Sequence, residues 1–164
     1  MNKPLWVLDT NVVLDLLHFD DAVARPLRAA LEDGRVRCVA TDATLDEWRR
    51  VLAYPEFALT SDRQADLFAR YQALSVRTEG VEADTGVPRQ GAPNPSGNPV
   101  WHRIPRCSDP DDQKFIDLAA DARAQGLVSK DHAVLRLRRR CAPLYRVMTP
   151  AEAVRRLSAA DAAA

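Results

Sequence analysis

The sequence predicts an α/β fold of three layers, in which helices cover both faces of a central, mostly parallel sheet. Short apolar runs, typical of strands buried on both faces, recur along the chain. They alternate with segments whose apolar residues have helical spacing. This alternation favours a parallel sheet, because parallel strands need a crossover connection, usually a helix, between them.

Length and composition indicate one ordinary globular domain. The chain has 164 residues, so we expect a single domain over residues 1–164. Lys plus Arg equals Asp plus Glu at 23 each, and no global basic field indicates a nucleic-acid partner. Three widely spaced cysteines disfavour a disulfide framework or a zinc site. With no signal peptide and no long apolar stretch, we expect a cytoplasmic protein without a membrane segment.

The first predicted strand, residues 4–8, leads directly into Asp9, Thr10 and Asn11. Asp9 is therefore expected at the carboxyl end of a strand, where open α/β sheets form their ligand crevice. Thr10 and Asn11 can cap the helix that follows. Taken alone, Asp9 is explained equally well as part of that cap.

The remaining elements follow from apolar spacing and from residues that begin or end helices. Asp20-Asp21 is expected to begin a helix, and Gly34, Pro55 and Gly126 are expected to end three of them. The predicted helices cover about 12–17, 22–32, 43–53, 62–74, 111–124, a segment from near 132 to 139, and the residues after 149. The predicted strands cover about 36–40, 75–78, 127–129 and 144–148.

One stretch, about residues 79–108, differs from the rest because it is rich in proline and glycine. This composition predicts an irregular loop, and long loops of this kind are usually functional. Trp101 lies in the loop, where it can stack on a base or bury itself in a dimer contact. Trp6 and Trp48 lie on apolar faces and are expected in the core.

Acidic residues recur where strands end or helices begin. Asp131 follows the strand at 127–129, and Glu47 lies in the first turns of the helix after the second strand. In a parallel sheet Asp9 and Asp131 reach the same edge, and Asp112 opens a helix that must also start at an edge. Clustered carboxylates repel unless a cation compensates them, and all-oxygen ligands suit Mg²⁺ or Mn²⁺. Such ions can activate water to cleave a phosphodiester.

Each acid also has an explanation that needs no metal. Acids at helix N-termini favour the helix dipole, which accounts for Asp109 and Asp111. Glu47 can pair with Arg50 on a solvated face, and Asp131 can be a simple N-cap. The joint pattern favours a metal site more strongly than any single residue does.

The same stretches resemble the PIN domain family, and within it the branch of toxin components of toxin–antitoxin pairs. Five motifs carry the resemblance, in order along nearly the whole chain. They are the opening strand-and-acid motif Val7–Asn11, the second-acid motif Leu45–Glu47, the C-x-D-P-D-D-x-K-F segment Cys107–Phe115, the segment Val128–Asp131, and the closing T-P-x-E segment Met148–Glu152.

This resemblance implies a PIN-like fold with a ribonuclease site that depends on Mg²⁺ or Mn²⁺. The implied metal ligands are Asp9, Glu47, Asp112 and Asp131, supported by hydrogen bonds from Asn11 and Ser129. The resemblance also implies an RNA substrate, a cognate antitoxin protein and a homodimer. The basic residues nearest to these acids in sequence, which either hold the RNA backbone or form solvated surface charge, are Arg49, Arg50 and Lys130.

One departure from the family pattern concerns the third acid. Related toxins more often hold it at the position of Gln113, so Asp112 would take this role from one residue earlier, with Asp109 or Asp111 able to share it. The alternative function is therefore a catalytically weak PIN-fold module that binds RNA or protein. Two other classes of protein are disfavoured. A dehalogenase-type phosphatase needs a second Asp where Asn11 stands. A nucleotide-binding module is disfavoured because neither a GxGxxG motif nor a P-loop is present.

Overall fold

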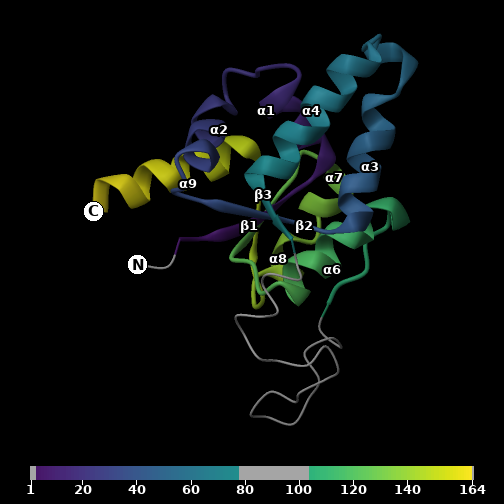
Figure 1. Cartoon of the computed structure of the whole chain (residues 1–164). Helices are drawn as coiled ribbons and strands as arrows, with labels where there is room; N and C mark the ends of the chain where they lie inside the picture. The colour runs from purple at the N-terminus through teal and green to yellow at the C-terminus, as the bar shows by residue number, and fades with distance from the viewer. Residues whose placement is uncertain (1–2, 78–103, 164) are drawn as a thin grey trace.

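The computed structural model describes residues 3–77 and 104–163, which form a single five-stranded sheet with helices on both faces (Figure 1). The strand order is β3-β2-β1-β4-β5, and all four neighbouring pairs are parallel. The strands are β1 (Leu5–Leu8), β2 (Arg37–Ala40), β3 (Ser75–Arg77), β4 (Gly126–Val128) and β5 (Arg146–Met148). The predicted α/β/α class is confirmed, and the sheet is parallel throughout the described residues.

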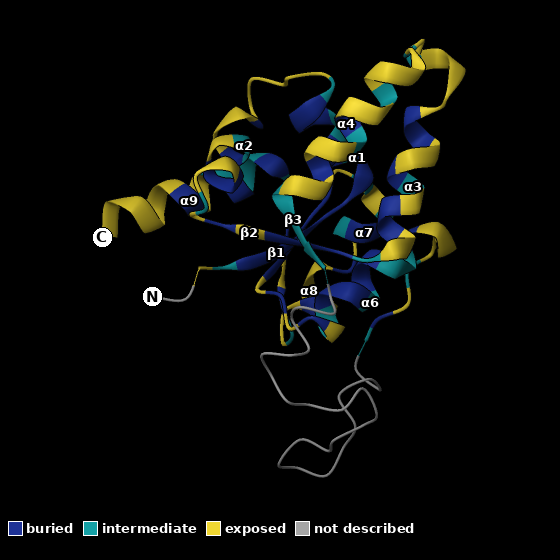
Figure 2. Ribbon diagram, viewed as in Figure 1, coloured by how far each residue is buried: buried dark blue, intermediate teal, exposed yellow. Residues whose placement is uncertain are grey.

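The central strand β1 explains why its sequence is apolar without interruption. All four of its residues are buried. Trp6 and Leu8 point into the core on one face of the sheet, while Leu5 and Val7 point into the core on the other. Figure 2 shows this buried sheet between helices whose outer surfaces are exposed.

The helices divide between these two cores. One face of the sheet packs against α1 (Thr10–Leu17), α2 (Arg25–Glu32), α3 (Asp42–Leu52), α4 (Ser61–Leu74) and α9 (Pro150–Ala163). The other face packs against α6 (Gln113–Asp121), α7 (His132–Leu135) and α8 (Arg138–Cys141). Two short 3₁₀ turns complete the described elements, η1 (Pro55–Phe57) and η3 (Pro110–Asp112).

The sheet order creates a switch point beside β1. The chain continues from β1 to β2 on one side of it, whereas β4 and β5 lie on the other side. Open α/β sheets bind ligands beyond the carboxyl ends of the strands at such a point. Asp9 follows β1 directly and Asp131 follows β4, so both acids lie at this edge of the sheet.

Several predicted boundaries need correction. Helix α2 begins at Arg25 rather than near residue 22, after a turn in which the backbone N–H of Val23 donates to Asp21. Gly126 does not end a helix: it lies in β4, where an added Cβ would meet Met148 at 2.6 Å. The left-handed backbone position after α6 is Arg123, with φ of 52°.

The remaining predictions are confirmed in part. Trp6 and Trp48 are buried in the core as predicted. The single helix expected to end near residue 139 is instead two short helices, α7 and α8. Of the predicted loop at 79–108, the described residues 104–108 contain no helix or strand, and Trp101 lies outside the described residues. No helix in the described parts of the chain combines the length and apolarity that crossing a bilayer requires.

Candidate metal centre

Asp9 is a buried carboxylate at the centre of the switch-point edge. It is the N-cap residue of α1, and its main-chain oxygen accepts from the N–H groups of Val12 and Val13. Its side chain makes no capping hydrogen bond and is instead bonded by the Ser129 hydroxyl, which donates to Oδ2 at 2.6 Å. The side chain of Asp9 is therefore not explained as a helix cap.

The Ser129 hydroxyl links Asp9 to the next acid along the edge. Ser129 has no exposed surface, and its Oγ also accepts the backbone N–H of Asp131 at 3.0 Å. The side chain of Asp131 caps α7 by accepting the N–H of Ala133 on Oδ1 at 2.8 Å. The simple N-cap interpretation thus describes one oxygen of Asp131, and the cap also fixes the orientation of the whole carboxylate.

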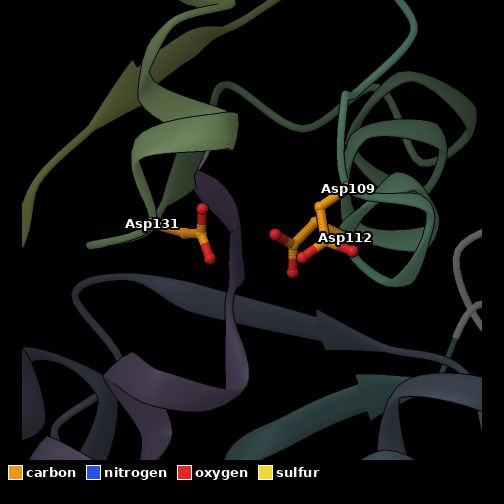
Figure 3. A group of neighbouring side chains, drawn as sticks. All are labelled: Asp109, Asp112 and Asp131. Atoms are coloured by element: carbon orange, nitrogen blue, oxygen red, sulfur yellow. The ribbon is translucent and has the colours of Figure 1, made fainter.

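Three carboxylates from two segments lie close together at this edge. Asp109, Asp112 and Asp131 each offer an oxygen within 4.8 Å of the other two. Figure 3 shows Asp109 and Asp112 on the η3 side and Asp131 on the opposite side, with the carboxylates of Asp112 and Asp131 directed into the space between them. Asp109 also caps η3 by accepting the N–H of Asp111, whose own side chain is exposed.

Burial and mutual repulsion raise the pKa of two of these acids. The pKa of Asp9 rises to about 6, chiefly through burial and also through the charges of Glu47 and Asp131, although the Ser129 hydroxyl opposes the rise. The pKa of Asp112 rises to about 7, again chiefly through burial and then through Asp9, Asp131 and Asp109. A compensating cation would remove the repulsion that contributes to both shifts.

Asp112 has a carboxylate oxygen whose hydrogen-bonding requirement is not met by the described residues. It is 9% exposed, and its Oδ2 is buried without a hydrogen-bond partner among the described residues. A buried carboxylate oxygen without a donor is costly to desolvate. Its neighbours in the group are also carboxylates, and this all-oxygen donor set fits a hard divalent cation such as Mg²⁺ or Mn²⁺. The residues present therefore fit the metal that the sequence predicts.

Glu47 reaches the same region from α3, held by two other elements. Its Oε2 accepts a short hydrogen bond from the Thr10 hydroxyl of α1, and its Oε1 lies 2.6 Å from Nζ of Lys114 of α6. The alternative pairing of Glu47 with Arg50 is wrong, because the cation beside it is Lys114. Glu47 is close enough to Asp9 to raise the pKa of that acid.

Two of the sequence-based hydrogen-bond roles differ from the structure. Thr10 and Asn11 do not cap α1, because both lie inside it and Asp9 takes the N-cap position. The Oδ1 atom of Asn11 is buried and has no hydrogen-bond partner among the described residues. Its predicted support of the acids stays a prediction, whereas Ser129 makes a direct hydrogen bond to Asp9.

Gln113, the position at which the resemblance to the toxin branch predicts an acid, serves the neighbouring segment. Its Oε1 accepts the N–H of Cys107 at 2.7 Å, and its Nε2 donates to the Pro105 carbonyl and to Asp117. It thereby fastens the chain just before Asp109 to the start of α6. Within this segment Asp109 and Asp112 lie among the acids.

Two of the three basic residues named from the sequence, Arg49 and Lys130, pair with other acids. Lys130 Nζ lies 2.7 Å from Oδ2 of the buried Asp15, and Arg49 lies 3.6 Å from Asp46 while its guanidinium stacks over Phe68. Lys130 is therefore more than a solvated charge, because it ties the loop that carries Asp131 to α1. The RNA-binding role of Arg49, Arg50 and Lys130 stays a prediction.

Sequence reasoning missed two contributors, Thr10 as a donor to Glu47 and Lys114 as its cationic partner. Both residues stand within the quoted motifs, since Thr10 follows Asp9 and Lys114 follows Gln113. Their contacts with Glu47 could not be predicted from the sequence, because they join α1 and α6 to α3.

Comparison with known proteins agrees with this architecture. No curated protein and no solved structure matches the chain. A family model described as "PIN domain" matches residues 6–133, a span that runs from β1 into α7 and includes all the acids discussed above. With its parallel sheet and its acids at the switch point, the chain belongs to the PIN domain family and has a nuclease fold.

Proposed function

We propose that the chain is a divalent-metal-dependent ribonuclease that hydrolyses RNA phosphodiester bonds. The observation that carries the proposal is the buried, unpartnered Oδ2 of Asp112 among the carboxylates of Asp109 and Asp131. The nuclease fold of the family supports the reaction class. The ion is Mg²⁺ or Mn²⁺, since every candidate ligand atom is a carboxylate oxygen.

The proposed ligands are the four acids named from the sequence, with Asp109, which was expected to be able to share the role of Asp112, as a fifth. They are Asp9, Glu47, Asp112, Asp131 and Asp109. A divalent ion held there supplies a water of lowered pKa and charge stabilisation for the phosphate.

The protein's own groups orient these acids. Ser129 fixes Asp9, the Ala133 N–H fixes Asp131, and Thr10 fixes Glu47. In the metal-free protein near neutral pH, Asp112 holds a proton part of the time, because its pKa is about 7. A cation bound there would favour the deprotonated carboxylate of Asp112.

The nearest competing function is a PIN-fold module that binds RNA or protein with weak catalysis. Gln113 favours it, because this side chain offers no carboxylate and is committed to Pro105, Cys107 and Asp117. The unpartnered Oδ2 of Asp112 favours the nuclease, since a bound cation would compensate this buried oxygen.

The test is cleavage of a labelled RNA pool in Mg²⁺, in Mn²⁺ and with EDTA, using wild type, Asp112→Asn and Asp111→Asn. Asp111 is the matched control, because it is the adjacent acid and is exposed outside the acidic group. We expect metal-dependent cleavage that Asp112→Asn abolishes and Asp111→Asn retains. RNA binding with no cleavage in either metal would instead support the binding module.

The biological setting follows the resemblance. The motifs Cys107–Phe115 and Met148–Glu152 support the role of a toxin in a toxin–antitoxin pair. Such a toxin would act on RNA in the cytoplasm, form a homodimer and bind a cognate antitoxin. Induced expression of the wild type should then arrest cell growth, and induced expression of Asp112→Asn should not. Light scattering should give twice the mass of the 18.2 kDa chain if the protein is a homodimer. Growth unaffected by active enzyme would contradict the toxin role.

A further inference from the structure

Lys114 is a basic side chain at the site to which no role has yet been given. It is the second residue of α6, and its Nζ lies 2.6 Å from Oε1 of Glu47 on α3. Both side chains are largely shielded from water, at 24% exposed for Lys114 and 17% for Glu47. Exposed ion pairs contribute little to stability, but a shielded pair is less screened and more closely defined in geometry.

Glu47 is held on both of its oxygens by residues next to the other acids. Thr10, the donor to Oε2, directly follows Asp9, and Lys114, the partner of Oε1, comes two residues after Asp112. The orientation of Glu47 is thus tied to the two backbone segments that carry those carboxylates. Among the four acids predicted as ligands, Glu47 is the one with a Lys or Arg partner within residues 3–77 and 104–163.

We propose that Lys114 is a positioning residue of the metal centre. Its ammonium group holds the Glu47 carboxylate beside Asp9 and offsets the repulsion between these two acids. The effect of Lys114 on metal binding rests on the proposed function, whereas the ion pair between Lys114 and Glu47 does not. Lys114 contributes as a fixed charge, since an ammonium group offers no lone pair to a metal.

The first experiment measures the pair in the metal-free protein. Lys114→Met should lower the melting temperature by about 3 °C in the wild-type background, because Glu47 loses its counter-charge beside Asp9. The same substitution should have no effect in a Glu47→Gln background, where no charge needs compensation. Equal losses in both backgrounds would overturn the proposal and assign Lys114 a packing role against Phe115.

The second experiment measures Mn²⁺ affinity by titration calorimetry. Lys114→Met should weaken binding by about tenfold, as substitution of groups that orient metal ligands typically does. Lys114→Arg should restore most of the affinity. Arg28→Met is the matched control: Arg28 is 28% exposed and lies 2.8 Å from Glu32 on α2, so its loss should leave Mn²⁺ affinity unchanged.

The possible results separate the two proposals. Unchanged or tighter Mn²⁺ binding in Lys114→Met would overturn the positioning role, and tighter binding would make Lys114 a competitor of the metal. If wild type binds no Mn²⁺, the proposed function fails. The melting temperatures in the Glu47→Gln background then still decide whether Lys114 holds Glu47.

Discussion

Asp9 and Asp112 are two buried acids at the same edge of the sheet, and they differ in what surrounds them. Asp9 is 4% exposed and receives the Ser129 hydroxyl, and its pKa rises to about 6. Asp112 is 9% exposed, has a buried oxygen without a donor, and its pKa rises to about 7. Burial is the largest cause of the rise in both acids, but a side-chain hydroxyl opposes it at Asp9, whereas three neighbouring carboxylates add to it at Asp112.

The comparison shows how hydrogen-bond donors and neighbouring charges modify the effect of burial on a carboxylate. Donors favour the charged form and offset part of the desolvation cost. Asp9 has its donors built into the protein, so it is held in place without a ligand. Asp112 has acids as neighbours, and this makes it the residue most dependent on an added cation.

The largest expected effect separates the two acids by substitution. Asp112→Asn should abolish metal-dependent cleavage, lowering kcat/KM by at least about 100-fold, and should also stabilise the metal-free protein. The raised pKa of Asp112 reflects desolvation and repulsion that a neutral amide relieves, so we expect the melting temperature to rise by about 6 °C. Asp9→Asn should abolish cleavage equally but stabilise less, because it disturbs the bond from Ser129.

Scanning calorimetry of both metal-free variants checks this contrast. An Asp112→Asn protein that melts lower than wild type would contradict the view that Asp112 is the uncompensated acid.

The pH dependence of stability sharpens the same comparison. Because the folded-state pKa of Asp112 lies above its unfolded value, the folded protein binds this proton more tightly. Stability of the metal-free protein should therefore rise as pH falls from about 7.5 towards about 5, and the rise should be smaller in Asp112→Asn. Denaturant midpoints across this range measure it, and a wild-type midpoint that falls throughout would contradict the assignment.

Ser129→Ala should make Asp9 more like Asp112. The variant removes the hydroxyl that lowers the pKa of Asp9, so this pKa should rise further. We expect a loss of about 1 kcal/mol in unfolding free energy and about tenfold weaker Mn²⁺ binding. Ser158→Ala is the control, because that hydroxyl bonds to the Val154 carbonyl on exposed α9. Equal behaviour of the two variants would remove Ser129 from the site.

The smallest effect is expected at Gln113. Gln113→Glu places an acid where the resemblance to the toxin branch predicts one, but it loses the Nε2 donations to Pro105 and Asp117. We expect a fall of about 2 °C in melting temperature and cleavage within about threefold of wild type. A clear gain in cleavage would show that position 113, rather than Asp112, is where the third acid belongs.

The sequence predicts the sheet well because strands buried on both faces must be apolar throughout, as β1 is. It also places Asp9 and Asp131 at one edge, since parallel strands share the direction of their carboxyl ends. Helix boundaries are less accurate: Gly126 was expected to end a helix and instead packs in β4 against Met148.

The contacts of the site were harder to predict than its members. Glu47 pairs with Lys114 because α3 and α6 approach each other in the folded chain, a proximity that no local pattern encodes. Asp109 fits a local explanation as the cap of η3, yet it also lies within the acidic group. Sequence spacing identifies candidates, and tertiary packing decides which of them meet.

The most direct test of the central claim is Mn²⁺ titration calorimetry on wild type, Asp112→Asn and Asp111→Asn near pH 7.5. If the unpartnered Asp112 carboxylate is the focus of a metal centre, wild type and Asp111→Asn should bind Mn²⁺ alike, and Asp112→Asn should lose binding by about 100-fold or more. Equal affinity in all three proteins, or no binding by wild type, would contradict it.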